Sequence, residues 1–257
     1  MIAIDKTLLD KIVTVADRAG AVILRHYEKG ATARTKADKS PVTDADEAAE
    51  AVILPALQLL LPGVPVIAEE AVARGGTPRI PEGKFWLVDP LDGTREFLKR
   101  NGEFTVNIAL VESETPLLGV VHAPALGLTY AACGSGTAVR RVDGEDFRPI
   151  AARKMPSDGA VVVASRSHAE PAQLEKFLSG TKVMGLKQAG SALKFGLIAS
   201  GEADLYPRLG RTMEWDTAAG HAVVLAAGGS VETLDGKPLR YGKTGFENPD
   251  FVARGRR

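Results

Sequence analysis

Residues 89–94, of sequence Asp-Pro-Leu-Asp-Gly-Thr, constrain this chain more than any other segment. They follow the apolar run 85–88, which is typical of a buried strand. The proline and the glycine favour a tight turn, in which both carboxylates and the leucine carbonyl face one point beyond the strand end. Oxygen ligands grouped in this way suit a hard divalent cation, above all Mg²⁺. The candidate ligands in this segment are Asp89, Leu91 and Asp92.

The end of the same segment suits an anion. Gly93 and Thr94 lead into a polar helix start, whose backbone N–H groups can bind a phosphate. Metal and phosphate would then lie side by side. Asp-Pro and Asp-Gly are also common turn pairs, and the stretch by itself is equally compatible with a loop of solvated acids. Acidic residues at the ends of other elements therefore decide between the two interpretations.

Other predicted elements do carry acids at their ends. Glu69 and Glu70 follow a short apolar strand at 64–68. Asp216 opens a helix of small residues, and Asp46 lies near the start of an earlier helix. Helix capping, a favourable helix dipole or simple exposure explains each acid taken singly. Taken together, these acids favour the functional interpretation of residues 89–94.

The combined pattern resembles the inositol monophosphatase superfamily of Mg²⁺-dependent, lithium-sensitive phosphatases. The matching segments occur in the family order and span nearly the whole chain, at residues 40–46, 67–70, 89–94 and 215–220. Shorter segments resemble the 3′(2′),5′-bisphosphate nucleotidase branch, at residues 164–168, 190–195 and 205–208. The resemblance implies an α/β fold, a layered αβαβα sandwich of the inositol monophosphatase and fructose-1,6-bisphosphatase type. Hydrophobic periodicity alone indicates only mixed α and β structure.

The resemblance implies a metal site and a means of activating water. The cofactor would be Mg²⁺, with two or three ions per site, and lithium would inhibit. Thr94 would align the attacking water and needs Asp46 as the carboxylate that takes up its proton. Glu70 is expected to lie next to the metal ligands without binding the metal itself, because the resemblance favours Glu69 as the ligand. The implied ligands are Glu69, Asp89, the Leu91 carbonyl, Asp92 and Asp216.

A site for a substrate with two phosphates is also implied. Lys194 and Arg208 would hold the phosphate remote from the metals, with hydrogen bonds from His168 and Ser191. Each has a simpler interpretation: a helix N-cap for Ser191, a loop histidine for His168 and surface charges for the other two. The residues expected to contact substrate are Glu69, Leu91, Asp92, Gly93, Thr94, His168, Ser191, Lys194, Arg208 and Asp216.

The favoured function is hydrolysis of 3′-phosphoadenosine 5′-phosphate to AMP and phosphate, or of 3′-phosphoadenylyl sulfate to adenylyl sulfate, in sulfur assimilation. The first alternative is a phosphatase for inositol or another polyol or sugar monophosphate. Lys194 and Arg208 favour the nucleotide, because a second phosphate needs cations of its own. The second alternative is a non-catalytic metal- or ligand-binding regulator of the same fold. Asp46 and Thr94 argue against that alternative, since a regulator needs neither.

Composition limits the architecture and the partners. A chain of 257 residues, 45% of them hydrophobic, can bury a real core. We expect one phosphatase domain in two intimate halves, a metal-site α+β half at 1–150 and a substrate-binding α/β half at 151–257. Acids and bases balance at 32 each, which argues against a nucleic-acid polymer but not against a small nucleotide. The single cysteine, Cys133, excludes an intrachain disulfide and a zinc–thiolate cluster.

The N-terminus predicts an amphipathic core helix that ends near Gly30, and no stretch approaches the ~20 apolar residues of a membrane span. A cytoplasmic enzyme is expected, with peripheral association with the inner membrane and the oligomeric state left open. The polar, basic stretch 30–40 is either a lid over an anion or a solvated linker. Further helices are predicted at 44–61, 171–178, 191–199 and 216–227, and second-half strands at 160–164, 182–185, 204–206 and 230–232.

Overall fold

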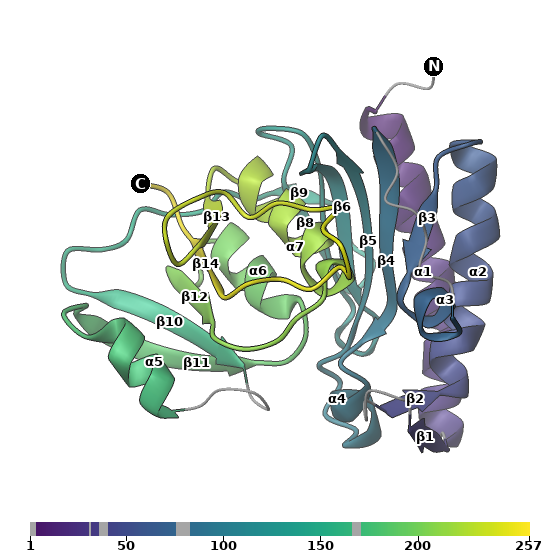
Figure 1. Cartoon of the computed structure of the whole chain (residues 1–257), viewed down its shortest axis with the longest axis horizontal. Helices are drawn as coiled ribbons and strands as arrows, with labels where there is room; N and C mark the ends of the chain where they lie inside the picture. Colours follow the sequence, from purple (N-terminus) through teal and green to yellow (C-terminus); the bar gives the residue numbers. More distant parts are fainter. Residues whose placement is uncertain (1–3, 31, 36–40, 76–82, 166–170) are drawn as a thin grey trace.

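The computed structural model describes residues 4–30, 32–35, 41–75, 83–165 and 171–257. Figure 1 shows five layers in these residues: α1 and α2, a large mixed sheet, α6 and α7, a smaller sheet, and α5 on the outside. The predicted αβαβα sandwich is therefore confirmed. The helices are α1 (Lys6–Lys29), α2 (Asp44–Leu60), α3 (Glu69–Ala73), α4 (Thr94–Leu98), α5 (Pro171–Leu178), α6 (Leu193–Ala199) and α7 (Glu214–Ala226), with a 3₁₀ turn η1 (Pro124–Leu126).

The large sheet runs in the order β3-β4-β5-β6-β7-β8-β9, with β3 parallel to β4 and every other pair antiparallel. Its central strands are buried on both faces because helices cover each side, which explains their nearly continuous apolar sequence. Its strands are β3 (Val66–Ala68), β4 (Lys84–Asp92), β5 (Thr105–Glu112), β6 (Thr115–Ala123), β7 (Leu128–Cys133), β8 (Val139–Val142) and β9 (Arg148–Pro149).

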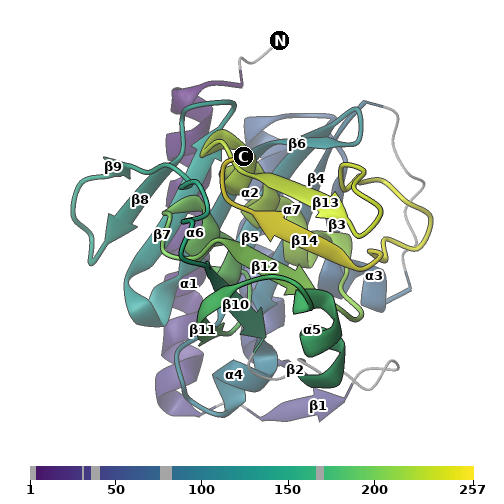
Figure 2. The same ribbon diagram turned by 90° about the vertical axis from the view of Figure 1, so that its left-hand side faces the viewer.

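The smaller sheet has the order β11-β10-β12-β14-β13. Figure 2 looks onto this sheet, with α5 lying over it. Leu174 and Phe177 of α5 pack against a small apolar cluster on that face. The last strand in sequence, which no sequence pattern predicted, pairs between β12 and β13. The strands are β10 (Ala160–Ser165), β11 (Val183–Ala189), β12 (Leu205–Arg208), β13 (Ser230–Thr233) and β14 (Phe251–Arg254).

Helix α7 is buried on nearly all sides, because it lies between the two sheets. Its small residues allow this close packing. A Cβ atom added to Gly220 would come within 2.4 Å of the Phe195 ring, and one added to Gly119 of β6 would come within 2.3 Å of the Ala219 carbonyl oxygen. The small-residue sequence of α7 therefore reflects the narrow space between the sheets.

Most predicted elements are present, with differences at their ends. Helix α1 ends at Lys29 before Gly30, as predicted, and α5 has the predicted bounds. β11 and β12 extend further than expected, and α6 begins at Leu193. The strands of the large sheet all lie within the first predicted half and those of the small sheet within the second, although division into two units stays a prediction. No described helix combines the length and apolar character of a membrane span.

The stretch 30–40, predicted as a lid or a linker, lies partly outside the described residues. Its described part contains β1 (Ala33–Thr35), which pairs with β2 (Pro41–Thr43). Arg34 of β1 forms ion pairs of 2.9 Å with Asp44 and 3.0 Å with Glu47 at the start of α2. The choice between lid and linker stays open.

Candidate active site

A cavity of about 710 Å³ brings the predicted site residues together. Its walls come from the β4–α4 corner, the start of α3, the region around α6, the end of β12 and the first turn of α7. Asp46 lies behind the wall, buried, and His168 falls outside the described residues. The predicted residues that line the cavity are Glu69, Asp89, Leu91, Asp92, Gly93, Thr94, Ser191, Lys194, Arg208 and Asp216.

A bulge in β4 directs two carboxylates to the same face of the large sheet. The prediction that this strand ends before its acids is wrong, because β4 pairs with β5 at Asp89 and again at Asp92. Between these points β4 advances three residues while β5 advances two, from Asn107 to Thr105. In a regular strand residues three apart face opposite ways, and the extra residue cancels that alternation. Pro90 lies in the bulge, where the strand has no ladder hydrogen bond to lose.

Asp92 is held by a buried polar network. Ser191 Oγ donates to Asp92 Oδ2 at 2.6 Å, and Asn107 Nδ2 donates to the same oxygen at 3.3 Å. The Thr105 hydroxyl donates to Asn107 Oδ1 at 2.9 Å and also contacts Ser191 Oγ. Burial raises the pKa of Asp92, and the hydrogen bond from Ser191 opposes that shift. These hydrogen bonds fix the direction of the Asp92 carboxylate. They also replace hydrogen bonds to water that burial removes.

Ser191 holds Asp92 in place and does not cap a helix. The N-cap of α6 is Ala192, so the interpretation of Ser191 as a cap is wrong. Its backbone lies in the left-handed region, with φ of 52°, which is uncommon for a residue other than glycine. That conformation brings its hydroxyl to Asp92. A direct contact of Ser191 with substrate stays a prediction.

Thr94 and Asp46 are in contact, although 48 positions separate them. Thr94 Oγ1 donates to Asp46 Oδ1 at 3.3 Å. The other carboxylate oxygen of Asp46 accepts from the backbone N–H of Thr43 at 2.8 Å and from its hydroxyl at 2.7 Å, as part of a capping box at the start of α2. Asp46 therefore takes part in a helix cap, and its second oxygen accepts from Thr94, while its role in proton transfer stays a prediction.

Glu69 and Asp216 enter the cavity from two helix starts. Glu69 is the first residue of α3, and buried Glu50 accepts the next two N–H groups of that helix, at 3.1 and 3.2 Å. Asp216 is the third residue of α7 rather than its cap, and Met213 N–H donates to its Oδ2 at 2.8 Å. Burial, together with the charges of Asp92 and Glu69, raises the pKa of Asp216 well above its usual range.

These carboxylates form an acidic wall whose donors suit Mg²⁺. The wall offers carboxylate oxygens and the Leu91 carbonyl and no sulfur, as a hard cation requires. Among the described residues, no three acidic, histidine or cysteine side chains already surround a single point as a ligand set. A cation shared between these carboxylates would neutralise several of them at once. Burial and the charges of Asp92 and Glu69 raise the pKa of Asp216, and a bound cation would relieve the repulsion among these carboxylates.

Two buried cations face this acidic wall. Lys194 is only 3% exposed, and Nζ donates to the carbonyl oxygens of Ser191 at 2.5 Å and Ala189 at 3.3 Å. Burial, with some help from Arg208, lowers the pKa of Lys194 to about 8. Arg208 is 9% exposed, and its Nε has no hydrogen-bond partner among the described residues. The interpretation of Lys194 and Arg208 as surface charges is therefore wrong, and their donors suit a second anion in the cavity.

Comparison with known proteins assigns the family. The model of the inositol monophosphatase family matches residues 5–253. The chain belongs to the inositol monophosphatase family. Similar proteins include the 3′(2′),5′-bisphosphate nucleotidase CysQ of Escherichia coli strain K12, which is 45% identical over 256 residues covering 95% of this chain and 98% of that protein. CysQ of Buchnera aphidicola is 42% identical, over 96% and 94% of the two chains.

Solved structures agree with this assignment. The crystal structure of CysQ from Bacteroides thetaiotaomicron, a bacterial member of the inositol monophosphatase family, matches with a TM-score of 0.80 and 36% identity over 97% of each chain. An inositol monophosphatase from Anabaena matches with a TM-score of 0.75 and 26% identity, over 98% of this chain and 91% of that one. Both matches span the two sheets, so the family fold extends over the whole described molecule.

Some residues of the site in this member of the inositol monophosphatase family had no predicted role. Asn107 and Thr105 lie at alternate positions of β5 and are fully buried, so two polar residues on one face of an otherwise apolar strand were the available signal. Arg74, Arg95 and Arg211 also line the cavity. Arg95 directly follows the 89–94 motif, whereas Arg74 and Arg211 lie outside every motif and reach the cavity through the packing of distant segments.

Proposed function

We propose that this protein is a Mg²⁺-dependent phosphatase that removes the 3′-phosphate of 3′-phosphoadenosine 5′-phosphate, giving AMP and phosphate, or acts in the same way on 3′-phosphoadenylyl sulfate. The buried pair Lys194 and Arg208, in the same cavity as the acidic wall, carries the proposal. Two separate sites of opposite charge suit a substrate with two phosphates. The 45% identity to a 3′(2′),5′-bisphosphate nucleotidase supports it. The proposal includes a role in sulfur assimilation and a location in the cytoplasm.

The acidic wall would hold two or three Mg²⁺ ions. When bound, such ions neutralise phosphate oxygens and lower the pKa of water. The residues that fit this role are Glu69, Asp89, the Leu91 carbonyl, Asp92 and Asp216. The network of Ser191, Asn107 and Thr105 would hold Asp92 in the required direction.

Thr94 and Asp46 would direct the attacking water. Thr94 Oγ1 would accept a proton from the water as the new P–O bond forms, and would pass its own proton to Asp46 Oδ1, to which it already donates at 3.3 Å. The backbone N–H groups of Gly93 and Thr94 would donate to the phosphate. The bond from phosphorus to the nucleoside 3′-oxygen then breaks, and that oxygen leaves with the electron pair and is protonated.

Hydrolysis of an inositol or sugar monophosphate is the second candidate. The similarity to an inositol monophosphatase of 26% identity favours it, because the metal wall alone would serve such a substrate. A non-catalytic regulator is disfavoured by the contact between Thr94 and Asp46, which binding alone does not require.

Phosphate release separates these functions. Purified protein would be assayed with Mg²⁺ against 3′-phosphoadenosine 5′-phosphate, 3′-phosphoadenylyl sulfate, AMP, inositol 1-phosphate and fructose 1,6-bisphosphate. We expect the two 3′-phosphorylated nucleotides to give the highest kcat/KM. A higher value for inositol 1-phosphate would establish the second candidate, and no release from any substrate would leave only a regulator.

Loss of Lys194 or Arg208 should affect the bisphosphate selectively. In Lys194→Ala and Arg208→Ala we expect kcat/KM for the bisphosphate nucleotide to fall at least ~10-fold, as for one lost charge-assisted contact of about 1.5–3 kcal/mol. A monophosphate lacks the remote group and should lose less. The measurement compares both substrates at one ionic strength, because salt screens such contacts. Equal losses for both substrates would remove these residues from the remote phosphate site.

Lithium is expected to inhibit the enzyme. Li⁺ resembles Mg²⁺ in size but carries one charge, so in a metal position of the acidic wall it would neutralise phosphate incompletely. Initial rates measured over a series of LiCl concentrations at limiting Mg²⁺ should fall, whereas matched NaCl, which controls for ionic strength, should leave them nearly unchanged. Equal effects of the two salts would contradict a Li⁺-accessible metal position.

A further inference from the structure

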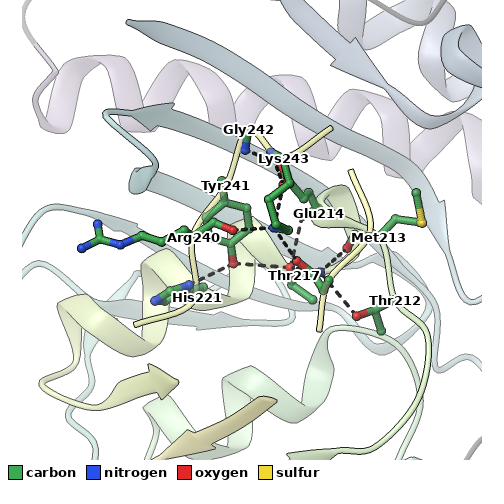
Figure 3. A network of polar contacts seen from close by, with 10 residues as sticks. Thr212, Met213, Glu214, Thr217, His221, Arg240, Tyr241, Gly242 and Lys243 are labelled. Atoms are coloured by element: carbon green, nitrogen blue, oxygen red, sulfur yellow. Dashed lines mark hydrogen bonds and ion pairs between the residues drawn. The ribbon is translucent and has the colours of Figure 1, made fainter. Parts of the chain in front are cut away.

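A buried polar network joins the first turn of α7 to residues 240–248 (Figure 3). The side chains that form its core, Glu214, Lys243 and Asn248, do not line the cavity, whereas Thr212, Met213 and Asp216 do. The network reaches the site through the backbone of Thr212 and Met213 and through the Thr217 side chain, since all three of these residues line the cavity. We call it the α7 clamp.

Glu214 forms one half of the α7 clamp. Its side chain is fully buried, at 0% exposure. It accepts from the backbone N–H groups of Gly242 at 2.7 Å and Lys243 at 2.8 Å, and from Lys243 Nζ at 2.6 Å. A buried carboxylate is retained only where its oxygens are well satisfied, and these three donors satisfy it. Glu214 thus fastens the start of α7 to a segment that follows the helix by many residues.

Asn248 forms the other half. Its Nδ2 donates to the Met213 carbonyl at 2.8 Å and to Thr217 Oγ1 at 3.0 Å, and its backbone N–H donates to the Thr212 carbonyl at 2.9 Å. The N–H of the same Met213 residue donates to Asp216 Oδ2 at 2.8 Å. Asn248 is therefore linked through Met213 to the carboxylate that enters the acidic wall.

The segment that carries Asn248 is held in an unusual conformation. Phe246 has φ of 57°, in the left-handed region that bulky residues rarely adopt. It is buried, its ring centroid lies 5.9 Å from that of Trp215, and its carbonyl accepts from Glu214 N–H at 2.8 Å. Such a backbone persists only where its surroundings determine it strongly, and such positions cluster at functional sites.

We propose that Glu214 and Asn248 are positioning residues that set the cation affinity of the site by fixing the direction of Asp216. The inference rests on the proposed function, in which Asp216 is a metal ligand. A small rotation of the first turn of α7 would move the Asp216 carboxylate away from the wall. A displacement of about 1 Å in a functional group can lower a reaction rate strongly. The loss of a group that orients a metal ligand typically lowers metal affinity ~10–100-fold.

The test measures metal binding without substrate. The wild type, Glu214→Gln and Asn248→Ala would be titrated with Mn²⁺, as a stand-in for Mg²⁺, by isothermal titration calorimetry. We expect both variants to raise the Kd for Mn²⁺ at least ~10-fold. With substrate, the Mg²⁺ concentration for half-maximal rate should rise similarly, while kcat at saturating Mg²⁺ should recover to within a few-fold. If Asn248→Ala does not fold, Asn248→Asp replaces it, because it keeps the shape and loses the donating Nδ2.

A matched control separates positioning from general stability. Asp204 is also a buried carboxylate, held by Arg153 at 2.8 Å and by Val161 N–H at 2.7 Å, but it lies outside the cavity lining. Asp204→Asn should lower the thermal unfolding midpoint and leave the Kd for Mn²⁺ unchanged. If the α7 clamp variants lose stability but keep the wild-type Kd, the inference is overturned. If the wild type itself binds no Mn²⁺, the proposed metal site fails, and the inference fails with it.

Discussion

Replacing Asp89 or Asp216 by Asn is expected to lower kcat/KM at limiting Mg²⁺ by at least ~10³-fold, with the fold intact. Each change keeps the shape of the side chain and removes one charge from the acidic wall, where a bound cation is expected to contribute several kcal/mol of transition-state stabilisation. The measurement is kcat/KM over a series of Mg²⁺ concentrations, with circular dichroism to verify the fold.

Asp216→Asn should not destabilise the metal-free protein. Burial and the charges of Asp92 and Glu69 raise the pKa of Asp216, so its ionised form opposes folding, and this cost is present above the unfolded-state pKa. Asp216→Asn removes that cost, and its unfolding midpoint at neutral pH without metal should equal or exceed that of the wild type. Asp235 is exposed, so Asp235→Asn is the control and should keep wild-type activity. Wild-type activity in either cavity variant at limiting Mg²⁺ would remove that residue from the metal site.

Thr94→Ala should lower kcat by ~10²–10⁴-fold and leave metal binding nearly unchanged. The lost hydroxyl is the group that would accept the proton of water, and positioned proton transfer contributes a factor of this size. Thr94→Ser keeps the hydroxyl and is the matched control, so it should retain most of the activity. The two variants would be compared by kcat at saturating Mg²⁺ and by calorimetric titration with Mn²⁺. An equal loss in Thr94→Ser would show that packing of the methyl group matters, rather than proton transfer.

Asp46→Asn should resemble Thr94→Ala, because the two side chains are in contact and are proposed to act as one unit. The double variant should then lose little more activity than either single variant. Asp46 also caps α2, and a weakened cap costs about 1 kcal/mol of stability, so assays belong well below the unfolding temperature. Fully multiplicative losses would show that Thr94 and Asp46 act independently.

Local signals predicted much of the fold correctly. The amphipathic pattern of the N-terminus predicted helix α1, and Gly30 predicted its end, because both signals lie within or next to the helix itself. The strand β14 could not be predicted in the same way. Its place between β12 and β13 depends on pairing with segments distant in sequence, and its four residues are too short a stretch to show a strand pattern.

The sequence by itself determined which acids could form a metal site, because their spacing and order are local properties of four motifs and their resemblance to a family needs no coordinates. Only the tertiary structure decided which way they face. The bulge between Asp89 and Asp92 turns both side chains to one face of the sheet, whereas residues three apart in a regular strand face opposite ways. The bulge can be recognised only from the pairing of β4 with β5. Burial of Lys194 and Arg208, and the hold of Asn248 on the Met213 backbone, likewise arise from contacts between distant segments, which no local pattern encodes.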